Sequence, residues 1–512
     1  MKQGFSSRSA PYVAAKVPST HGLDLVRRLS RAPPCKADGF RLAGSWHAAH
    51  IMVRVVDTRR SGTVLALAIL TTLAIDFASA RSYDRRIFGR PWFATAGGVL
   101  LGVLALLWLR APREISVKSS WARWLGVLPV VTAMTSIYVR GLLEPGPTFA
   151  FGAIAVAGVG VMVLAAAAGR TSILLGGAVA SGVALRAFEF SLVPINPGWG
   201  DMLPLVLLAI TSAVGGESPY RVYHVPWSLP LTYMPLGWLA YAPLFLARLD
   251  PRWTNTLAEV SVLGAVYFCG RKRQDKTLRD AAATLWAAWF VASRIVKYDS
   301  GIAAQVQWAA ISWLAALAVE KNRWTPAAFG MALATTVLAL PLAPTLAVAW
   351  HRAWSRPLSP HPRRARAFPV ARATLFAALV GAELIVPWVI GSPRAFFDGV
   401  VLWFNDIDRF PSWKWAESRE WTLHPGLAGL FWTLHLERWM KPIQIVLITG
   451  LAVLYARKTA ASGPRETLGP ELVAVFLLFI LFNPMVWSYL WEPSLCLALV
   501  ALASARTGAM TQ

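Results

Sequence analysis

The residue in this chain best suited to chemistry is Asp201, which lies in a polar loop between the apolar run Ile173 to Leu192 and an amphipathic stretch. A carboxylate is costly to bury unpaired, and beside a membrane an ionisable residue marks a functional site by default. Asp is suited to act as a general base that accepts the proton of an attacking hydroxyl. The alternative is that Asp201 caps a helix over Met202 to Thr211, and one residue can do both.

Cationic side chains that could stabilise a developing negative charge lie near the same boundary. Arg186 and Glu189 share one face of a predicted helix at spacing i,i+3, where they either contact substrate or only neutralise each other. Arg221 and His224 follow a Pro-Tyr turn, and Lys297 precedes a further polar loop. For these three, a solvated or snorkelling side chain is the alternative.

The elements that must position these residues are predicted to be membrane helices. The chain is 56% hydrophobic and 15% charged, with a mean hydropathy of +0.49, which excludes an ordinary soluble domain. The net charge of +24 is concentrated in short loops between apolar runs, so we expect membrane orientation and no nucleic-acid binding. The 3 cysteines are far apart and form no CxxC pair, so no disulfide framework or zinc site is expected.

The predicted fold class is all-α: a polytopic integral membrane protein with about 12–14 transmembrane or re-entrant helices. Apolar segments lie at about 62–80, 94–109, 124–141, 148–168, 171–192, 230–247, 256–270, 281–296, 303–319, 326–350, 373–391, 441–457, 470–486 and 489–505. Alternation of sides indicates that either 230–247 or 256–270 is short, tilted or re-entrant. Pro341 and Pro344 predict that 326–350 forms a hairpin of two half-length helices.

The chain is expected to divide into six parts. They are a disordered basic cytoplasmic tail (1–61), N-terminal transmembrane helices (62–192), an outer catalytic loop (193–229), central transmembrane helices (230–391), a Trp-rich outer loop (392–440) and C-terminal transmembrane helices (441–512). The basic loops Arg110 to Arg123, Arg271 to Arg279, His351 to Arg372 and Arg457 to Arg465 are expected on the cytoplasmic side. The Asp201 loop then faces outward.

The Trp-rich loop supplies a second group of candidates. Asp406, Asp408, Lys414 and His424 offer polar contacts to a substrate, and Trp413, Trp415 and Trp421 offer aromatic faces on which a substrate can stack. The alternative is an interfacial helix whose Trp residues only position it at the headgroups. Two acids at i,i+2 are weak grounds for a metal site, and we predict no metal and no cofactor.

Several motifs together resemble the C-type glycosyltransferase superfamily, and most closely glycosyltransferase family 87, the polyprenyl-phosphate-mannose-dependent mannosyltransferases. They are the acid of Gly200-Asp201, a G-x-x-P-Y turn (Gly216, Pro219, Tyr220), a Y-x-P motif (Tyr233, Pro235), SGIAAQVQ (Ser300 to Gln307) and NPMVWSYLWEP (Asn483 to Pro493). The chain departs from the family where no Lys precedes Pro341 and where Ser488 replaces an expected His.

The resemblance implies a hexosyltransferase that moves mannose or a similar sugar from a polyprenyl-phosphate donor to a lipid-linked or glycan acceptor at the outer face of the cytoplasmic membrane. It implies that Asp201 is the general base and that Tyr220, Tyr233 and Gln305 belong to the substrate-binding region. Two other classes stay open: a multi-pass transporter or flippase for lipids or lipid-linked sugars, and a non-catalytic membrane scaffold in which Asp201 is replaceable.

Overall fold

The computed structural model describes a large part of the chain, and every structural statement below concerns these residues. They are 66–71, 91–110, 114–115, 147–195, 201–225, 228–271, 276–292, 301–354, 368–403, 426–427, 430–431, 434–461, 468–483 and 488–507. The chain divides after Val55, and the whole first unit, Met1–Val55, lies outside the described residues. The predicted tail (1–61) and the predicted apolar segment 124–141 therefore lie outside them too.

The described chain is predominantly helical, as the recurring apolar runs predict. The longer helices are α5 (Pro91–Leu109), α7 (Pro147–Ala167), α8 (Thr171–Leu192), α12 (Trp253–Gly270), α13 (Thr277–Ala292), α14 (Gln305–Val319), α17 (Phe368–Val389), α21 (Met440–Ala461), α22 (Leu468–Leu481) and α23 (Glu492–Ser504). Each coincides with a predicted apolar segment to within a few residues. Backbone polar groups that cannot reach water are satisfied inside such helices.

Three of the described helices are long and apolar enough to cross a membrane: Thr171–Leu192, Val370–Val389 and Met440–Ala460. Several others are apolar but shorter, among them α14, α22 and α23. The prediction of a helical protein is confirmed, and these three helices have the length and composition that a membrane span requires. The predicted total of about 12–14 segments stays a prediction.

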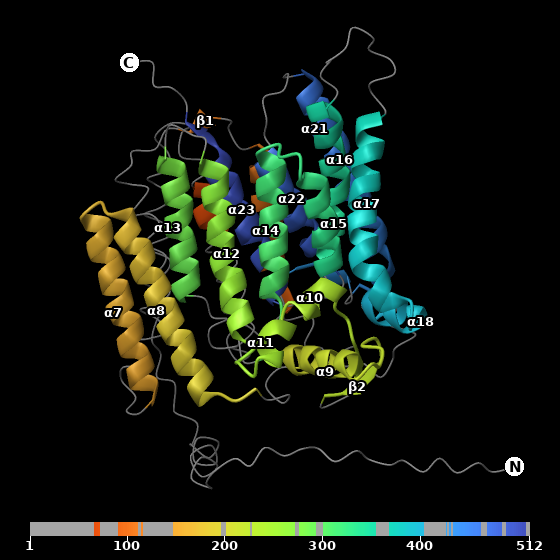
Figure 1. The fold of residues 1–512 in the computed structure, drawn as a ribbon. Coiled ribbons are helices and arrows are strands. Elements are labelled where there is room, and N and C mark those ends of the chain that lie inside the picture. Colours follow the sequence, from red (N-terminus) through yellow and green to blue (C-terminus); the bar gives the residue numbers. More distant parts are fainter. Residues whose placement is uncertain are drawn as a thin grey trace, which may run out of the picture. The chain divides into compact units, whose positions relative to one another are not determined.

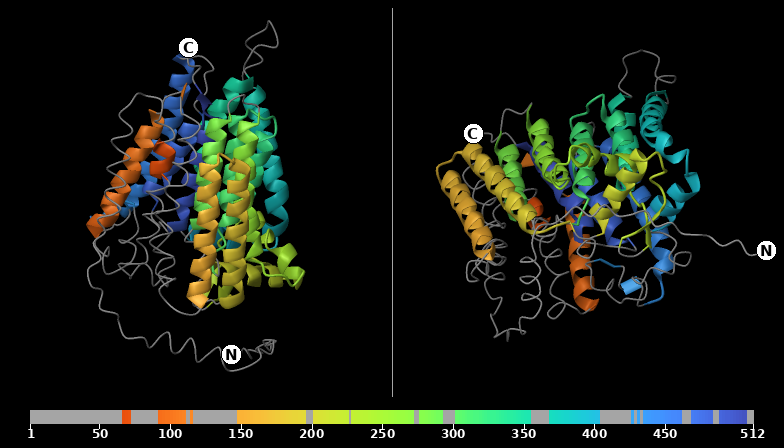
Figure 2. Two further views of the ribbon diagram at one scale, coloured as in Figure 1. Left: turned by 90° about the vertical axis from the view of Figure 1, so that its left-hand side faces the viewer. Right: turned by 60° about the horizontal axis from the view of Figure 1, so that its bottom comes forward.

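The helices α8, α12, α13 and α14 run side by side, and α7 lies along the outer side of α8 (Figure 1). Figure 2 shows α7 and α8 from the side as an antiparallel pair. Small residues allow this close approach: a Cβ added to Gly158 of α7 would lie 2.3 Å from Ser181 Oγ of α8, and one on Gly177 would lie 2.7 Å from Val161 Cγ1. Interfaces of this kind are typical of helices packed in a membrane.

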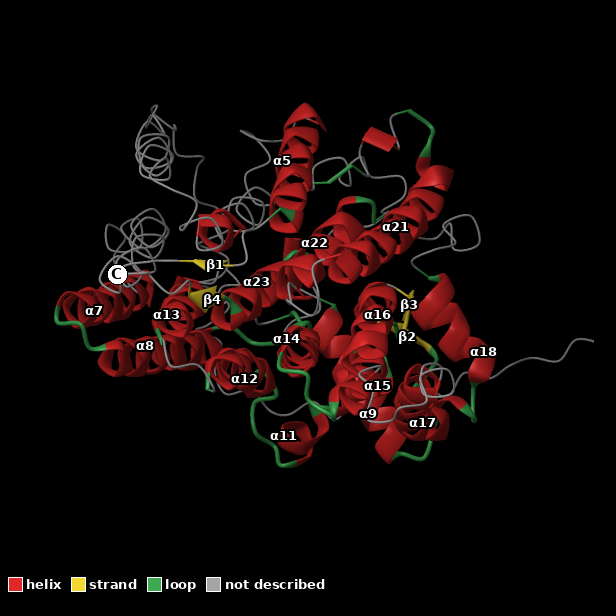
Figure 3. Cartoon of the chain, turned by 90° about the horizontal axis from the view of Figure 1, so that it is seen from above, coloured by secondary structure: helices red, strands yellow, loops and turns green. Residues whose placement is uncertain are grey.

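The helices α22 and α23 form the most deeply buried part of the bundle. Every residue of α23 is buried, from Glu492 to Ser504. It packs against α12, α13, α14 and α22, and the view along the bundle shows α22 and α23 next to each other behind α13 and α14 (Figure 3). A helix that is apolar on all sides is expected to be surrounded in this way.

The apolar segments 230–247 and 326–350, which were not expected to cross a membrane as single helices, are both interrupted. Residues 230–247 form only two short helices, α10 (Pro235–Leu239) and α11 (Ala242–Leu246), each with Pro in its first turn. Residues 326–350 contribute α15 (Thr325–Thr335), a 3₁₀ turn (Val337–Leu342) and α16 (Ala343–Trp354). Phe329 of α15 meets Trp350 of α16 edge to face at 5.9 Å, so the two halves fold back on each other as the predicted hairpin requires.

A small substructure lies at one end of the bundle. The helix α9 (Met202–Val214) lies across the lower end in Figure 1, followed by the antiparallel strands β2 (Val222–His224) and β3 (Ser228–Pro230). Buried side chains of α9, the strands and α10 share one apolar cluster, which Val400 and Trp403 complete. The sequence did not predict this strand pair, nor the short parallel pair β1 (Glu114–Ile115) and β4 (Arg506–Thr507), so the all-α prediction needs these two additions.

Candidate functional site around Asp201

Asp201 directly precedes α9 and has helical backbone angles, φ −90° and ψ −18°. A capping residue has non-helical, typically extended, angles and bonds the first turn through its side chain. The Asp201 side chain makes no capping hydrogen bond to α9. Asp201 therefore stands at the N-cap position of α9, where its carbonyl accepts from the Leu205 amide at 3.0 Å, but its side chain does not cap the helix.

The start of α9 is fixed by a turn that is distant in the sequence. The Leu203 amide donates to the Gly301 carbonyl at 3.0 Å. The next residue of that turn, Ile302, accepts a hydrogen bond at 2.9 Å from Nδ2 of Asn255, in the first turn of α12. The Tyr241 hydroxyl in turn donates to Asn255 Oδ1 at 2.5 Å. The position of Asp201 is thus set by α12 and the 301–304 turn as well as by α9.

Two tyrosines lie within electrostatic reach of Asp201. Desolvation raises the pKa of Tyr233 well above its ordinary value, and the nearby Tyr489 and Asp201 add to that rise. Desolvation also raises the pKa of Tyr489, with a further contribution from Asp201. Tyr233 lies in the bend before α10, and Tyr489 lies in the 3₁₀ turn Ser488–Leu490 before α23. Desolvation and a negatively charged neighbour both disfavour a phenolate. Both hydroxyls therefore stay protonated at physiological pH and remain hydrogen-bond donors.

Tyr220 supports this arrangement from inside the apolar cluster. It is 1% exposed, and its hydroxyl donates to the Tyr233 carbonyl at 3.1 Å and accepts from Trp238 Nε1 at 3.4 Å. Its ring packs edge to face on Phe396. The Tyr220 hydroxyl therefore holds the Tyr233 backbone, and a contact of Tyr220 with substrate stays a prediction.

Arg221 and His224 lie on the exposed side of the strand pair. Arg221 forms an ion pair with Glu217, donates to Ser212 Oγ at 2.8 Å and lies over the Tyr223 ring. His224 Nδ1 is 2.8 Å from Oγ of Ser228, its partner across the strands. These contacts fit the solvated alternative, and any role in binding substrate stays a prediction.

Arg186 is enclosed within the bundle. Its side chain is fully buried, forms a 2.5 Å ion pair with Glu259 of α12 and lies over the ring of Phe290 of α13. The same guanidinium donates to the carbonyls of Gly182 and Phe290, each at 3.1 Å. Glu259, the carboxylate that accepts this hydrogen bond, is 73 positions along the chain from Arg186. These contacts fit the alternative in which a carboxylate only neutralises Arg186, although that carboxylate is Glu259, and a role of Arg186 in binding substrate stays a prediction.

The other predicted site residues divide into one described residue and five that lie outside. Gln305 is fully buried at the start of α14, where its Oε1 accepts from the Ala304 amide at 3.1 Å. Lys297, Asp406, Asp408, Lys414 and His424 lie outside the described residues, as do Trp413, Trp415 and Trp421. Within the described ranges, no three His, Cys, Asp or Glu side chains come together as a metal site.

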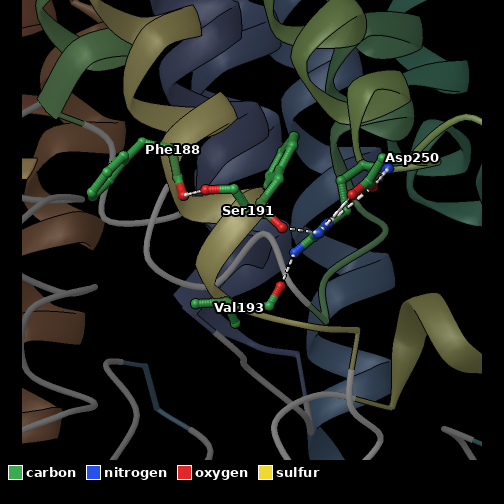
Figure 4. Close-up of polar contacts among 6 residues, drawn as sticks. Phe188, Ser191, Val193 and Asp250 are labelled. Atoms are coloured by element: carbon green, nitrogen blue, oxygen red, sulfur yellow. Dashed lines mark hydrogen bonds and ion pairs between the residues drawn. The ribbon is translucent and has the colours of Figure 1, made fainter. Parts of the chain in front are cut away.

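The residue that sequence reasoning missed is Arg252. It ends the short Asp250-Pro251-Arg252 turn before α12, is 3% exposed, and joins that turn to the end of α8 (Figure 4). Its Nη1 donates to the Val193 carbonyl at 2.5 Å and its Nη2 to the Phe190 carbonyl at 2.9 Å. An Arg beside an Asp in a Pro turn is a weak sequence signal, because most such pairs are exposed.

Comparison of the chain with protein-family models, curated proteins and solved structures finds no match. The resemblance to C-type glycosyltransferases therefore rests on the motifs of this sequence alone.

Proposed function

We propose that this protein is a membrane glycosyltransferase that uses a polyprenyl-phosphate-linked sugar, with Asp201 as its general base. The proposal includes a multi-pass topology with the Asp201 end of the bundle on the outer side of the cytoplasmic membrane. The donor is mannose or a similar sugar, and the acceptor is a lipid-linked or glycan hydroxyl. The motifs from Gly200 to Pro493 that resemble the family support this assignment.

The observation that carries the proposal is the setting of Asp201. Its carboxylate is not used as a helix cap, it lies at one end of the apolar bundle, and the protonated Tyr233 and Tyr489 are within its electrostatic reach. A base needs a fixed position and a proton acceptor that is not committed to holding its own helix. Two neutral hydroxyls nearby are suited to hydrogen-bond the hydroxyls of a sugar.

The reaction follows from these roles. The acceptor hydroxyl forms a bond to the anomeric carbon, its proton passes to Asp201, and the bond from the anomeric carbon to the phosphate oxygen breaks with its electron pair leaving on the lipid phosphate. The leaving phosphate requires positive or hydrogen-bonding groups. Arg221, His224 and Lys297 remain the candidates for this task, together with Lys414 and His424 of the Trp-rich loop.

The test is substitution of Asp201 in purified protein supplied with a panel of polyprenyl-phosphate sugars and membrane acceptors. Asp201→Asn keeps the size of the side chain and removes its basicity, so transfer is expected to fall by about 10²- to 10⁴-fold. Asp280→Asn is the matched control, because Asp280 is a partly exposed acid paired with Arg279 at the start of α13. Full transfer by both Asp201→Asn and Asp201→Ala would sink the proposal.

A second candidate, a transporter or flippase for lipid-linked sugars, is favoured by the interrupted hairpin of α15 and α16, since broken helices often form substrate sites in transporters. The two proposals differ in their product. In proteoliposomes loaded with a fluorescent polyprenyl-phosphate sugar and a glycan acceptor, a flippase changes the leaflet of the intact donor, whereas the transferase moves the sugar to the acceptor and releases free polyprenyl phosphate. Leaflet exchange of the intact donor without release of free polyprenyl phosphate would favour transport.

A further inference from the structure

All three guanidinium nitrogens of Arg252, the residue before α12, donate hydrogen bonds. Its Nε donates to both carboxylate oxygens of Asp250, at 2.9 and 3.0 Å, and its Nη2 donates to Asp250 Oδ2 at 2.6 Å. The two carbonyl contacts, to Val193 and Phe190, complete the set (Figure 4). The guanidinium also lies 4.4 Å from the centre of the Phe190 ring.

These contacts join two helix ends. The last carbonyls of a helix have no partner within that helix, and a cation beside them also opposes the negative end of the helix dipole. Arg252 satisfies such carbonyls at the end of α8 while standing immediately before α12. Asp250 balances its charge, so this cation can be buried at 3% exposure. The chain leaving α8 toward Asp201 therefore starts from a fixed point.

The first turn of α12 also fixes the other side of Asp201. Asn255, three residues after Arg252, donates to the Ile302 carbonyl. The neighbouring Gly301 carbonyl accepts from the Leu203 amide, two residues after Asp201. Arg252 thus holds the end of α8 that precedes Asp201 in the chain, and Asn255 holds the turn bonded to Leu203 just after Asp201; these two residues lie at the start of α12.

We propose that Arg252 and Asn255 are positioning residues that set the location of the Asp201 carboxylate; the catalytic consequence rests on the proposed function. Neither is a catalytic residue. The guanidinium donors of Arg252 are directed at Asp250 and at the α8 carbonyls, and the Asn255 amide bridges Tyr241 and Ile302. Both act on the reaction only through the place where they hold Asp201.

The kinetic test compares Arg252→Lys and Asn255→Ala with Arg271→Met. Lys keeps the charge but lacks the fork that reaches Asp250, Phe190 and Val193 together. Arg271 is the matched control, because it also lies over a Phe ring, Phe268 at 4.0 Å, but at the opposite end of α12. We expect kcat to fall by about 10- to 100-fold in the first two variants, the effect of a misplacement of about 1 Å. The KM for the donor should change little, and Arg271→Met should match the unsubstituted protein.

A second measurement does not depend on activity. In a chain with Cys35, Cys269 and Cys496 replaced, Asp201→Cys is labelled with a membrane-impermeant maleimide. We expect Arg252→Lys and Asn255→Ala each to change the labelling rate several-fold, and Arg271→Met to leave it unchanged. If Arg252→Lys does not fold, as judged by size-exclusion chromatography, Asn255→Ala carries the test.

The outcomes separate the two proposals. Unchanged labelling, or an unchanged kcat in both variants of an active enzyme, overturns the positioning role. A labelling change in a protein that transfers none of the sugars supports the positioning role and contradicts the proposed function. A rise in donor KM with kcat intact also overturns the positioning role, because it would mean that these residues bind substrate.

Discussion

Removal of one partner from the buried pair of Arg186 and Glu259 should be among the most destabilising single changes in the bundle. Both side chains are fully buried and 2.5 Å apart. Glu259→Leu removes the carboxylate that pairs with the Arg186 cation, whose guanidinium also contacts the Gly182 and Phe290 carbonyls and the Phe290 ring. A buried charge that loses its counter-ion costs about 3–5 kcal/mol. The double variant Arg186→Leu/Glu259→Leu removes both charges, so we expect it to recover most of that loss.

The assay is a double-mutant cycle on reversible unfolding in mixed micelles of detergent and SDS. The exposed pair of Arg221 and Glu217 provides the control, since its side chains are 48% and 59% exposed. There Glu217→Leu should cost no more than about 1 kcal/mol. A loss below about 1 kcal/mol for Glu259→Leu, or a double variant no more stable than the single one, would refute the reasoning.

Two further predictions concern packing and pH. Gly237→Ala should cost about 1–3 kcal/mol in the same unfolding assay, because its Cβ would lie 2.7 Å from the Thr335 carbonyl oxygen. Gly450→Ala, with no atom within 4 Å of its Cβ, should be neutral or stabilising, and equal losses in both would contradict this. Because the pKa of Tyr233 is raised in the folded state, its contribution to stability is complete below pH of about 10, the ordinary tyrosine pKa, and is lost above it. Tyr233→Phe should make the fall in melting temperature between pH 9 and 11 shallower, and an unchanged slope would contradict the assigned burial.

Hydrophobic pattern alone was enough to predict most of the described helices. A run of apolar residues must be satisfied internally in lipid, so α8, α17 and α21 could be located without knowledge of their neighbours. Proline spacing was also informative, since Pro341, which has no amide proton, lies in the 3₁₀ turn that separates α15 from α16. These signals are local, and they were interpreted correctly.

Features that depend on distant contacts could not be predicted in this way. Arg186 and Glu189 are neighbours on one helix face, yet the ion pair is made with Glu259 because α8 and α12 come together in the fold. The strands β2 and β3 are only three residues each. The three residues between them, 225–227, give too weak a turn signal for the strand pair to be predicted from the sequence. The sequence located Asp201 as an acid between apolar segments. Its proximity to Tyr489 could not be predicted, because it depends on how α23 packs against the rest of the bundle.

Arg186 and Arg252 show why loss of activity alone would not identify a catalytic cation in this protein. Each is buried, each pairs with one carboxylate, and each donates to two backbone carbonyls. Their chemistry is therefore nearly the same, and a change at either would lower activity through the fold. What separates them is position: Arg186 joins the bundle at mid-helix, whereas Arg252 fixes the end from which the chain continues to Asp201. Only a measurement made at Asp201 itself, such as its labelling rate, can distinguish a general loss of stability from a displaced carboxylate.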